Sequence, residues 1–510
     1  MISKILEYGL KRDPNKIAIF EQDDFYTYEE LDEYVGKLAQ GMKDQLCLKE
    51  HDVLAMMSSN TIEYIFTLFA CWRLGVTLTP MNPALKPDEI KYQLENSNAK
   101  VFIYEGYCAD KAKEAVAKME NKPSMFVFRG EPTRSEARFT ELFSYEKYEA
   151  RDVSLDTLAL LIYTSGTTGK PKGVMLTHQN VLAAIEGFSE FLRLDESDRS
   201  YLILPLFHVN SIHLTLSAPL SKGGSVVLTN RFKAESFVIN VARYKPTYTI
   251  GVPTVFRMLD ELPEEQIRSY DLSSLKFALC GGAPFTVAEF EKIQKKFPFK
   301  ILEAYGLSEA TVCSTSNPID GKHKVGSIGI PLPGQQVKII DEQGVELSPY
   351  EKGELLIKGK VVMKGYLNDE VKTKETIKDG WLYTGDIAYQ DEDGYLYIVD
   401  RKKEMIIRGG INIYPKEIEQ VIYELPYIKE VAIVGVPDEK YGEEVVGYVA
   451  VYENTQVTEA ELINYCKQKI ANYRCPKRIY FLDSLPKNSV GKISKHKLVE
   501  LSKKDESMNL

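Results

Sequence analysis

The sequence lacks the features of secreted, membrane-spanning and nucleic-acid-binding proteins. Its seven cysteines are scattered over 510 residues without a CxxC pair, so it indicates neither a disulfide framework nor a zinc site. The longest strongly apolar stretch, residues 64–72, has about half the length that a bilayer span requires. The formal net charge of -9 argues against binding to nucleic acid, which needs a basic face.

The ends of the sequence carry no recognisable targeting signal. Charged residues interrupt the first ten positions, which does not fit a secretory signal and instead predicts an amphipathic first helix. One side of that helix would be formed by Ile2, Ile5, Leu6 and Leu10. The last four residues match neither a peroxisomal nor an endoplasmic reticulum retention signal. We therefore expect a cytoplasmic protein without a transmembrane segment, and leave open a peripheral contact with a membrane.

What the sequence does contain is the composition of an ordinary globular protein, with 44% hydrophobic and 27% charged residues. Its length suits roughly three domains, or one large composite domain and a smaller one. Early in the chain the pattern alternates between helical segments, at residues 28–46 and 62–74, and extended segments, at 52–57 and 76–80. This alternation is typical of βαβ units, so we predict an α/β fold with doubly wound, mostly parallel sheets.

The same pattern continues toward the middle of the chain and then changes. Apolar runs predict further buried strands at residues 158–163, 201–205, 225–228 and 275–279. From residue 325 to 399, short strands separated by glycine-rich turns predict a small antiparallel β subdomain or β-barrel.

Beyond residue 400 the chain starts a new arrangement of elements. A helix is predicted at residues 415–425, a strand at 431–436 and another helix at 458–471. This is enough for one small α+β domain. We therefore predict a large N-terminal domain over residues 1–400 and a small, mobile lid domain over residues 401–510, with the boundary at 400–403.

The segment from Tyr163 to Gly173 has the composition of a phosphate-binding loop. It contains three glycines, four hydroxyl residues and two lysines, which together supply backbone N–H groups, side-chain donors and positive charge for a polyphosphate. It is not a Walker A motif, because only two residues separate Gly166 from Gly169 and Pro171 follows the lysine. A protein kinase is also disfavoured, since no His-Arg-Asp or Asp-Phe-Gly element occurs.

This loop resembles the phosphate loop of the adenylate-forming superfamily, which includes acyl-CoA synthetases, adenylation domains and luciferase. Five further blocks extend the resemblance over nearly the whole chain: Gly-Gly-Ala-Pro at residues 281–284, Tyr-Gly-Leu-Ser-Glu at 305–309, Tyr-Thr-Gly-Asp at 383–386, Asp-Arg-Lys-Lys-Glu at 400–404 and Pro-Lys-Asn-Ser-Val-Gly-Lys at 486–492. The pattern is most similar to that of bacterial fatty-acyl-CoA ligases. The resemblance implies activation of a carboxylic acid as acyl-AMP, with release of pyrophosphate, and then transfer of the acyl group to CoA.

Several residues receive nucleotide-binding roles from this resemblance. Magnesium prefers oxygen ligands and usually keeps waters, so one carboxylate with substrate phosphates suffices, and Glu309 is the expected Mg2+ ligand. Thr164 and Ser308 would be phosphate donors and Lys172 a loop cation. The remaining expected contacts to ATP are Ser165, Gly166, Thr167 and Thr168 in the loop, Gly281, Gly282, Ala283 and Tyr305 at the adenine, and Asp386 and Arg401 at the ribose.

The resemblance also implies residues for the reaction and for the motion of the lid. Lys492 would be the catalytic lysine that bridges the acid and the α-phosphate during adenylation. Lys403 would be the hinge residue, where some members of the superfamily have Asp instead. Gly409 and Gly410 would line the channel for the pantetheine arm of CoA, and His208 would be the aromatic gate of the acid pocket.

The expected acid pocket, formed by residues 205–211, 251–256, the Gly281 loop and 311–316, contains no Arg or Lys. This favours a medium- or long-chain fatty acid over malonate or oxalate. An aryl or dicarboxylic acid, a carrier-protein thiol as acceptor, and a non-catalytic nucleotide-binding module stay open as alternatives. The expected partners are therefore small molecules, namely the acid, ATP and CoA, and the protein would be a monomer or a homodimer.

Overall fold

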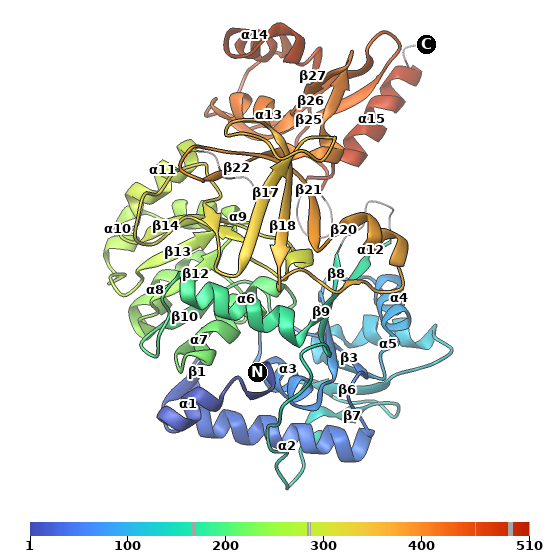
Figure 1. The fold of residues 1–510 in the computed structure, drawn as a ribbon, viewed down its shortest axis with the longest axis vertical. Helices are drawn as coiled ribbons and strands as arrows, with labels where there is room; N and C mark the ends of the chain where they lie inside the picture. The colour runs from blue at the N-terminus through green and yellow to red at the C-terminus, as the bar shows by residue number, and fades with distance from the viewer. Residues whose placement is uncertain (165–169, 283–284, 286, 454, 488–492, 509–510) are drawn as a thin grey trace. The chain divides into compact units, whose positions relative to one another are not determined.

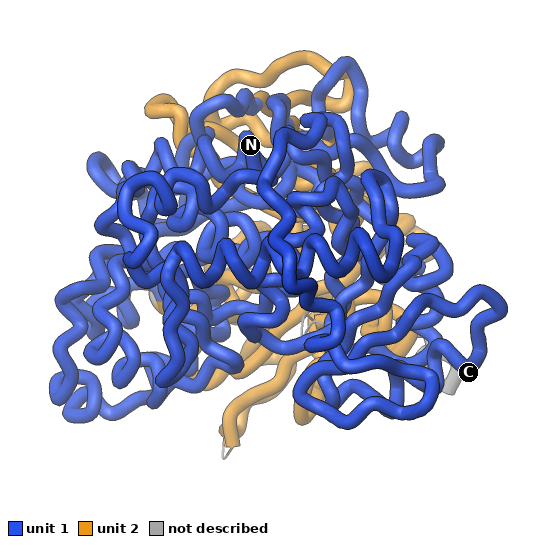
Figure 2. Tube along the Cα trace, turned by 90° about the horizontal axis from the view of Figure 1, so that it is seen from below, with its two compact units in different colours: residues 1–285, 290–337, 357–382 blue, residues 286–289, 338–356, 383–510 orange. Residues whose placement is uncertain are grey.

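The computed structural model describes residues 1–164, 170–282, 285, 287–453, 455–487 and 493–508, and its fold is drawn in Figure 1. The chain forms two compact units, which Figure 2 distinguishes by colour. Unit 1 comprises residues 1–285, 290–337 and 357–382. Unit 2 comprises residues 286–289, 338–356 and 383–510. The predicted division at residue 400 stays a prediction about domain organisation.

Unit 1 contains a sheet whose central strands are all parallel. In spatial order the strands are β16 (Ile330–Pro331), β15 (Thr315–Ser316), β14 (Lys300–Tyr305), β13 (Phe277–Cys280), β12 (Tyr248–Gly251), β10 (Arg199–Leu202), β11 (Ser225–Leu228), β1 (Ile17–Glu21) and β2 (Asp24–Thr27). Strands β14 through β1 pair in parallel, whereas β15, β16 and β2 are antiparallel additions at the edges. The predicted strand at residues 225–228 is confirmed.

The second sheet of unit 1 also combines a run of parallel strands with antiparallel strands at an edge. Its order is β19 (Gly365–Tyr366), β9 (Lys172–Thr177), β8 (Leu158–Thr164), β4 (Thr77–Met81), β3 (Val53–Met57), β5 (Val101–Glu105), β6 (Ser124–Phe128) and β7 (Ala137–Arg138). Pairing is parallel from β8 to β7, and β9 is antiparallel to both of its neighbours. The predicted α/β class is therefore confirmed, with mixed sheets.

Helices connect and cover these strands, as Figure 1 shows for α2 and α6. The α-helices from the N-terminus to residue 376 are α1 (Glu7–Arg12), α2 (Tyr28–Leu46), α3 (Ile62–Leu74), α4 (Pro87–Ser97), α5 (Ala109–Ala117), α6 (His178–Phe191), α7 (Ala218–Ser221), α8 (Ala234–Tyr244), α9 (Pro253–Asp260), α10 (Glu264–Arg268), α11 (Val287–Lys296) and α12 (Glu370–Thr376). Helix α2 begins where predicted because Thr27 and Glu30 form a capping box. It ends at Cys47, which has a left-handed backbone conformation.

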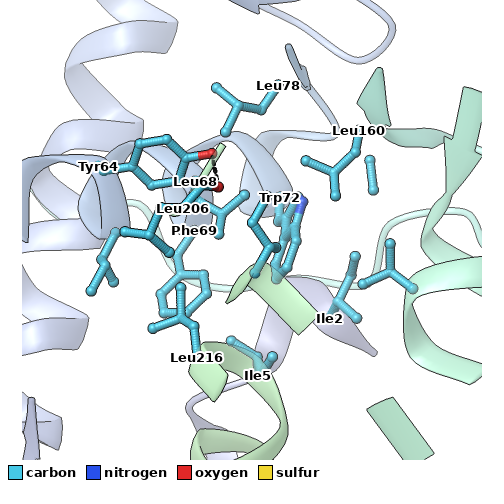
Figure 3. Packing of buried hydrophobic residues seen from close by; sticks show 14 of the residues in the cluster. Ile2, Ile5, Tyr64, Leu68, Phe69, Trp72, Leu78, Leu160, Leu206 and Leu216 are labelled. Carbon is cyan, nitrogen blue, oxygen red and sulfur yellow. Dashed lines mark hydrogen bonds between the residues drawn. The ribbon is translucent and has the colours of Figure 1, made fainter. Parts of the chain in front are cut away.

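The central core of unit 1 surrounds α3, whose side chains are buried on almost every side. Figure 3 shows Trp72 and Phe69 of this helix packed with Ile2, Ile5 and Leu216. The hydroxyl of Tyr64 donates a hydrogen bond to the carbonyl of Leu206, 2.9 Å away. The predicted amphipathic start is thus confirmed as a buried face, although the chain forms it from a short 3-10 turn (η1, Ile2–Lys4) followed by α1.

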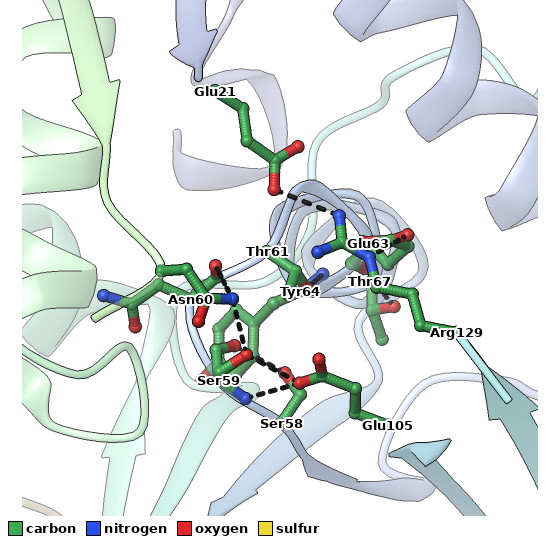
Figure 4. A network of polar contacts seen from close by, with 11 residues as sticks. Glu21, Ser58, Ser59, Asn60, Thr61, Glu63, Tyr64, Thr67, Glu105 and Arg129 are labelled. Atoms are coloured by element: carbon green, nitrogen blue, oxygen red, sulfur yellow. Dashed lines mark hydrogen bonds and ion pairs between the residues drawn. The ribbon is translucent and has the colours of Figure 1, made fainter. Parts of the chain in front are cut away.

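A polar network fixes the start of α3 to neighbouring strands (Figure 4). The guanidinium of Arg129 forms ion pairs with Glu21 at 3.1 Å and Glu63 at 3.0 Å. The carboxylate of Glu105 accepts hydrogen bonds from the Ser59 backbone N–H at 3.0 Å and from its hydroxyl at 2.6 Å. These contacts satisfy polar groups that burial would otherwise leave unpaired.

A third sheet contains β17 (Gln335–Ile340), β18 (Gly353–Gly359), β21 (Trp381–Gln390) and β20 (Ile377–Lys378), with β22 (Leu396–Arg401) paired to β21. Strands β20 and β22 are both antiparallel to β21. Strands β17, β18 and β21 each have residues in both units. Short strands occur in this region as predicted, while the prediction that residues 325–399 form a separate subdomain stays a prediction.

The C-terminal sheet belongs to unit 2 and contains β24 (Ile411–Ile413), β23 (Ile406–Arg408), β26 (Gly442–Val451) and β25 (Ile428–Asp438), with β27 (Arg478–Phe481) beside β26. Three helices accompany it: α13 (Pro415–Tyr423), α14 (Glu459–Lys469) and α15 (Lys495–Met508). In the described ranges, no helix is both long enough and apolar enough to cross a membrane.

Two buried histidines in unit 1 make its stability depend on pH. His178 begins α6, and His213 lies in the π-helical segment η4 (Ser211–Ser217). Both are 0% exposed, and within the described residues neither ring has a hydrogen-bond partner. Burial lowers the pKa of His178 to about 4 and that of His213 to about 3.

We predict that the free energy of unfolding falls as the pH decreases below about 6.5, the usual histidine pKa in an unfolded chain. The unfolded chain binds these protons while the folded chain does not, so the stabilisation is complete above that pH and is lost below it. Between about pH 7 and about pH 5 each histidine should cost about 2 kcal/mol. Urea unfolding of His213→Gln should show a pH-dependent loss smaller by that amount, and a loss equal to that of the parent protein would contradict the assignment.

Candidate active site

Two neighbouring parallel strands bring part of the predicted nucleotide site to one sheet edge. Strand β13 ends at Cys280 and β14 ends at Tyr305, and Cys280 is the register partner of Glu303. Gly281, Gly282 and Tyr305 therefore lie at the carboxyl ends of adjacent strands, the edge at which α/β sheets bind ligands. A Cβ atom on Gly281 would lie 2.7 Å from the carbonyl oxygen of Ala304, so only glycine allows this close approach of the two backbones.

The predicted phosphate loop connects two paired strands. Thr164 ends β8, Lys172 begins β9, and these two residues are register partners. Strand β9 follows the loop, and α6 begins directly after it, at His178. The short Lys172–Thr177 run was not recognised as a strand. As a consequence of this hairpin, Thr164 and Lys172 lie side by side at the end where the loop connects the two strands.

Glu309 joins this cluster through a tyrosine that the sequence analysis missed. Tyr366 lies in β19, which pairs with β9, and its hydroxyl donates a hydrogen bond of 3.0 Å to the Glu309 carboxylate. The Nζ of Lys172 lies 5.4 Å from the centroid of the Tyr366 ring, within cation–π range. Burial, together with the Glu309 charge, raises the pKa of Tyr366, which keeps its hydroxyl protonated as a donor. The two-residue strand gives no periodicity from which this role could be predicted.

The backbone around Glu309 is also fixed. Ser308 and Glu309 lie in a 3-10 turn (η5, Ser308–Ala310), and the Glu309 carbonyl accepts a hydrogen bond of 2.9 Å from the Met363 N–H. The Thr311 hydroxyl donates a hydrogen bond of 2.5 Å to the carbonyl of Val361. The segment that precedes β19 is therefore fixed to the turn that carries Glu309, which limits the positions its carboxylate can reach.

His208, the predicted gate, follows β10 in the chain. Its backbone N–H donates to the carbonyl of Pro205 at 3.1 Å, and its ring lies 4.5 Å from that of Phe207, between centroids. The side chain is exposed. The segment η4 begins three residues later, so the predicted pocket segment 205–211 leads into an unusual helix of the kind that is often found at functional sites.

Unit 2 brings together the two residues predicted at the ribose. Asp386 of β21 and Arg401 of β22 are register partners, and Arg401 Nε lies 3.2 Å from Asp386 Oδ1. The Asp386 side chain is 7% exposed, whereas that of Arg401 is 55% exposed. The backbone N–H of Asp386 donates to the Thr384 hydroxyl at 3.0 Å. The pair thus presents a fixed carboxylate acceptor beside a cation that solvent can reach.

The predicted hinge and channel residues lie in separate turns of unit 2. Lys403 is exposed in the 3-10 turn η6 (Lys402–Glu404), directly after β22. Gly409 and Gly410 connect β23 to β24 as a two-residue hairpin, with φ values of 59° and 81°. Positive φ at both central residues is what a tight hairpin of this kind requires, and glycine supplies it without strain.

Some predicted site residues lie outside the described residues. These are Ser165, Gly166, Thr167, Thr168, Ala283 and Lys492. Their roles stay predictions. The expectation that Asp386 and Arg401 bind the same nucleotide as the site residues of unit 1 also stays a prediction.

The donor set around Glu309 suits magnesium bound through substrate. No group of three or more His, Cys, Asp or Glu side chains capable of holding a metal occurs in the part of the chain that is described. A dedicated protein cage for a metal is therefore not present there. Magnesium commonly takes one or two carboxylates and completes its shell with phosphate oxygens and water, and a single half-buried carboxylate beside a phosphate loop fits that mode.

Comparison with known proteins agrees with this geometry. The family of AMP-binding enzymes matches residues 6–367, and the AMP-binding enzyme C-terminal domain matches residues 417–492. A long-chain-fatty-acid–CoA ligase of Bacillus subtilis is 34% identical, covering 98% of this chain and 94% of the relative. An oxalate–CoA ligase of Arabidopsis thaliana is 33% identical, covering 97% of each chain.

A solved structure supports the same relationship. ATP-bound MatB from Rhodopseudomonas palustris aligns with a TM-score of 0.89 at 29% identity, covering 98% of this chain and 99% of that chain. The family models thus cover Glu309 and the strands around it, and most of the C-terminal sheet, while the solved structure covers 98% of the chain. The chain therefore belongs to the AMP-binding enzyme family, as an adenylate-forming acid:CoA ligase.

Proposed function

We propose that this ligase activates a medium- or long-chain fatty acid as acyl-AMP and transfers the acyl group to CoA. The observation that carries the nucleotide part of the proposal is the cluster of Thr164, Lys172, Tyr366 and Glu309. It combines a hydroxyl donor, a cation and an oriented carboxylate at the end of one strand pair. A polyphosphate with its magnesium ion needs these three kinds of group.

The first step must bring two anions together, because the substrate carboxylate attacks the α-phosphate. Like charges about 4 Å apart repel by about 1 kcal/mol in water and about 4 kcal/mol at an effective dielectric near 20. Lys172 and Thr164 would hold the phosphates, and Lys492 would bridge the acid and the α-phosphate. A magnesium ion on Glu309 would supply further positive charge. The P–O bond to pyrophosphate breaks as the acyl-AMP bond forms.

The rest of the chain would bind the nucleoside and admit the second substrate. Gly281 and Gly282 leave room for the adenine beside Tyr305, while Asp386 would accept hydrogen bonds from the ribose hydroxyls with Arg401 beside it. Rotation of the lid at Lys403 would bring the Gly409–Gly410 hairpin to the pantetheine arm. The thiol of CoA would then attack the acyl carbonyl carbon, lose its proton and displace AMP.

The preference for a fatty acid is supported by the segments expected at the acid pocket. Leu206, Phe256 and Val312 are buried there. The hydroxyls of Ser211 and Thr315 are already occupied, because they donate to the carbonyls of Leu204 and Ile328 at 3.0 and 2.8 Å. These segments supply no Arg or Lys to pair with a second carboxylate.

One observation favours an acid with a polar substituent as the second candidate. Asn210 Oδ1 and Ser314 Oγ are buried without a hydrogen-bond partner among the described residues. Neutral groups of this kind can hydrogen-bond a hydroxyl or carbonyl on an aryl or dicarboxylic acid, and they would gain from doing so because unpaired buried polar atoms are costly.

A panel of acids tests the substrate directly. Pyrophosphate release would be measured with fatty acids of graded chain length, oxalate, malonate and 2-succinylbenzoate, each with and without CoA. We expect the highest kcat/KM for medium or long chains, and multiple turnovers only when CoA is present. Faster turnover of a dicarboxylic or aryl acid would establish the second candidate, and turnover that CoA does not stimulate would point to a carrier-protein acceptor.

Lys492→Ala separates the two half-reactions. We expect acid-dependent pyrophosphate release to fall by a factor of about 10² to 10³, the usual effect of removing a transition-state donor. Conversion of preformed acyl-AMP and CoA to thioester should continue. Equal loss of both half-reactions would show that Lys492 has no specific role in adenylation.

Tyr366→Phe tests the cluster in unit 1. Loss of the hydroxyl removes the donor that orients Glu309, and hydrogen bonds to charged groups contribute about 1.5–3 kcal/mol. We therefore expect kcat/KM for ATP to fall by about 10-fold or more. The matched control is Tyr397→Phe, which removes a similar hydroxyl–carboxylate bond to Asp391 within unit 2. If both variants behave alike, the hydroxyl of Tyr366 has no particular function in ATP binding.

A further inference from the structure

A cluster of charges in unit 2 has no role in the function proposed above. Lys495, the first residue of α15, forms ion pairs with Glu404 at 3.2 Å and with Glu419 at 2.8 Å. The side chains of Lys495 and Glu419 are 21% and 15% exposed, so this is a largely buried arrangement. Burial opposes the charged amine, but Glu419, Glu404 and Asp400 outweigh it and raise the pKa of Lys495.

The cluster joins three elements that are distant in sequence. Glu404 belongs to η6, next to the predicted hinge residue Lys403, and Glu419 lies in α13. The Glu419 carboxylate also accepts a hydrogen bond of 2.9 Å from the Ile433 N–H in β25. Asp400 accepts hydrogen bonds from the backbone N–H groups of Arg401 and Lys416, at 2.7 and 2.8 Å. The acidic partners of Lys495 therefore have fixed positions of their own.

Lys495 follows Lys492 by three positions in the sequence, shortly after the segment 488–492. Lys487 and Ile493 form an isolated β-bridge, and the Ser494 N–H donates to the carbonyl of Pro486 at 2.7 Å. Lys487 also pairs with Glu430 at 2.6 Å. Residues 486–487 and 493–494, which we call the stem, thus flank residues 488–492. The stem has the Lys487–Glu430 ion pair on one side and the ion pairs of Lys495 on the other.

We propose that Lys495 is a positioning residue for adenylation: by binding Glu404 and Glu419 it fixes the stem from which Lys492 reaches the substrate. The proposal rests on the function proposed for Lys492. Without the amine, Glu404, Glu419 and Asp400 would face one another as like charges in a poorly solvated place. The start of α15 would then shift away from them and change the direction of the preceding stem.

The test compares four variants in the full-length enzyme. Lys495→Met removes the charge but keeps the length of the side chain, and Lys495→Arg keeps the charge. Lys492→Ala serves as the reference for a direct loss of adenylation. Lys469→Ala is the matched control, because Lys469 forms a 2.9 Å pair with Glu424 in which both side chains are about half exposed.

Misplacing a reacting group by about 1 Å can cost about 10²-fold in rate. We therefore expect Lys495→Met to lower kcat for acid-dependent pyrophosphate release by about 10- to 100-fold. The KM for ATP and the thioester half-reaction should change by less than about 3-fold. Lys495→Arg should restore kcat to within about 3-fold of the parent enzyme, and Lys469→Ala should change neither half-reaction. These limits follow from a positioning role, in which the chemistry of Lys492 is kept but its placement is lost.

Several outcomes would overturn the inference. A Lys495→Met enzyme with unchanged kcat, or with equal losses in both half-reactions, would show that the cluster does not act on adenylation. If that variant loses its cooperative thermal unfolding, Glu404→Gln replaces it in the test. This substitution removes the ion pair between Lys495 and residue 404 and leaves Lys495 paired with Glu419. If Lys492→Ala itself spares adenylation, the proposed function has failed, irrespective of Lys495.

Discussion

The hydrogen bond between Tyr366 and Glu309 connects the fold of unit 1 to its chemistry. It forms only because β19, a strand of two residues, pairs with β9, whose first residue is Lys172. That pairing places an aromatic ring between a lysine and a carboxylate that are 137 residues apart in the sequence. The same ring contacts both charged groups, and this arrangement supports the proposal that both groups bind a polyphosphate.

In unit 2, ion pairs rather than an aromatic ring hold the charged side chains in place. Asp386 is held beside Arg401 across two antiparallel strands, and Lys402 pairs with Glu354 at 2.8 Å one residue further along. Lys495 then ties the residues after these strands to α13 and α15. Each of these carboxylates is at least half-buried, and a partly buried charge is tolerable only with a partner. These pairs hold the four carboxylates in defined positions within unit 2.

Much of the local structure could be predicted because local rules decide it. Helix α2 has a capping box at its start, and α3 is an apolar run that ends at Gly75 in a left-handed conformation. The strand at residues 225–228 was found because it is short, apolar and followed by polar residues. By contrast, β9 was missed, since its residues follow a glycine-rich loop and its partners lie in other parts of the chain. The contribution of Tyr366 was missed for the same reason, because a two-residue strand has no period to detect.

The sequence by itself determined the α/β class, the positions of some helices, such as α2 and α3, and, through the order of its motifs, the family of AMP-binding enzymes. These depend on residue types and on spacings along the chain, which act over a few residues. Only the tertiary structure decided that Tyr366 orients Glu309 and that Lys495 pairs with Glu404 and Glu419. Such contacts join residues that are 57 to 91 positions apart in the sequence, and sheet pairing and burial, rather than local preference, bring them together.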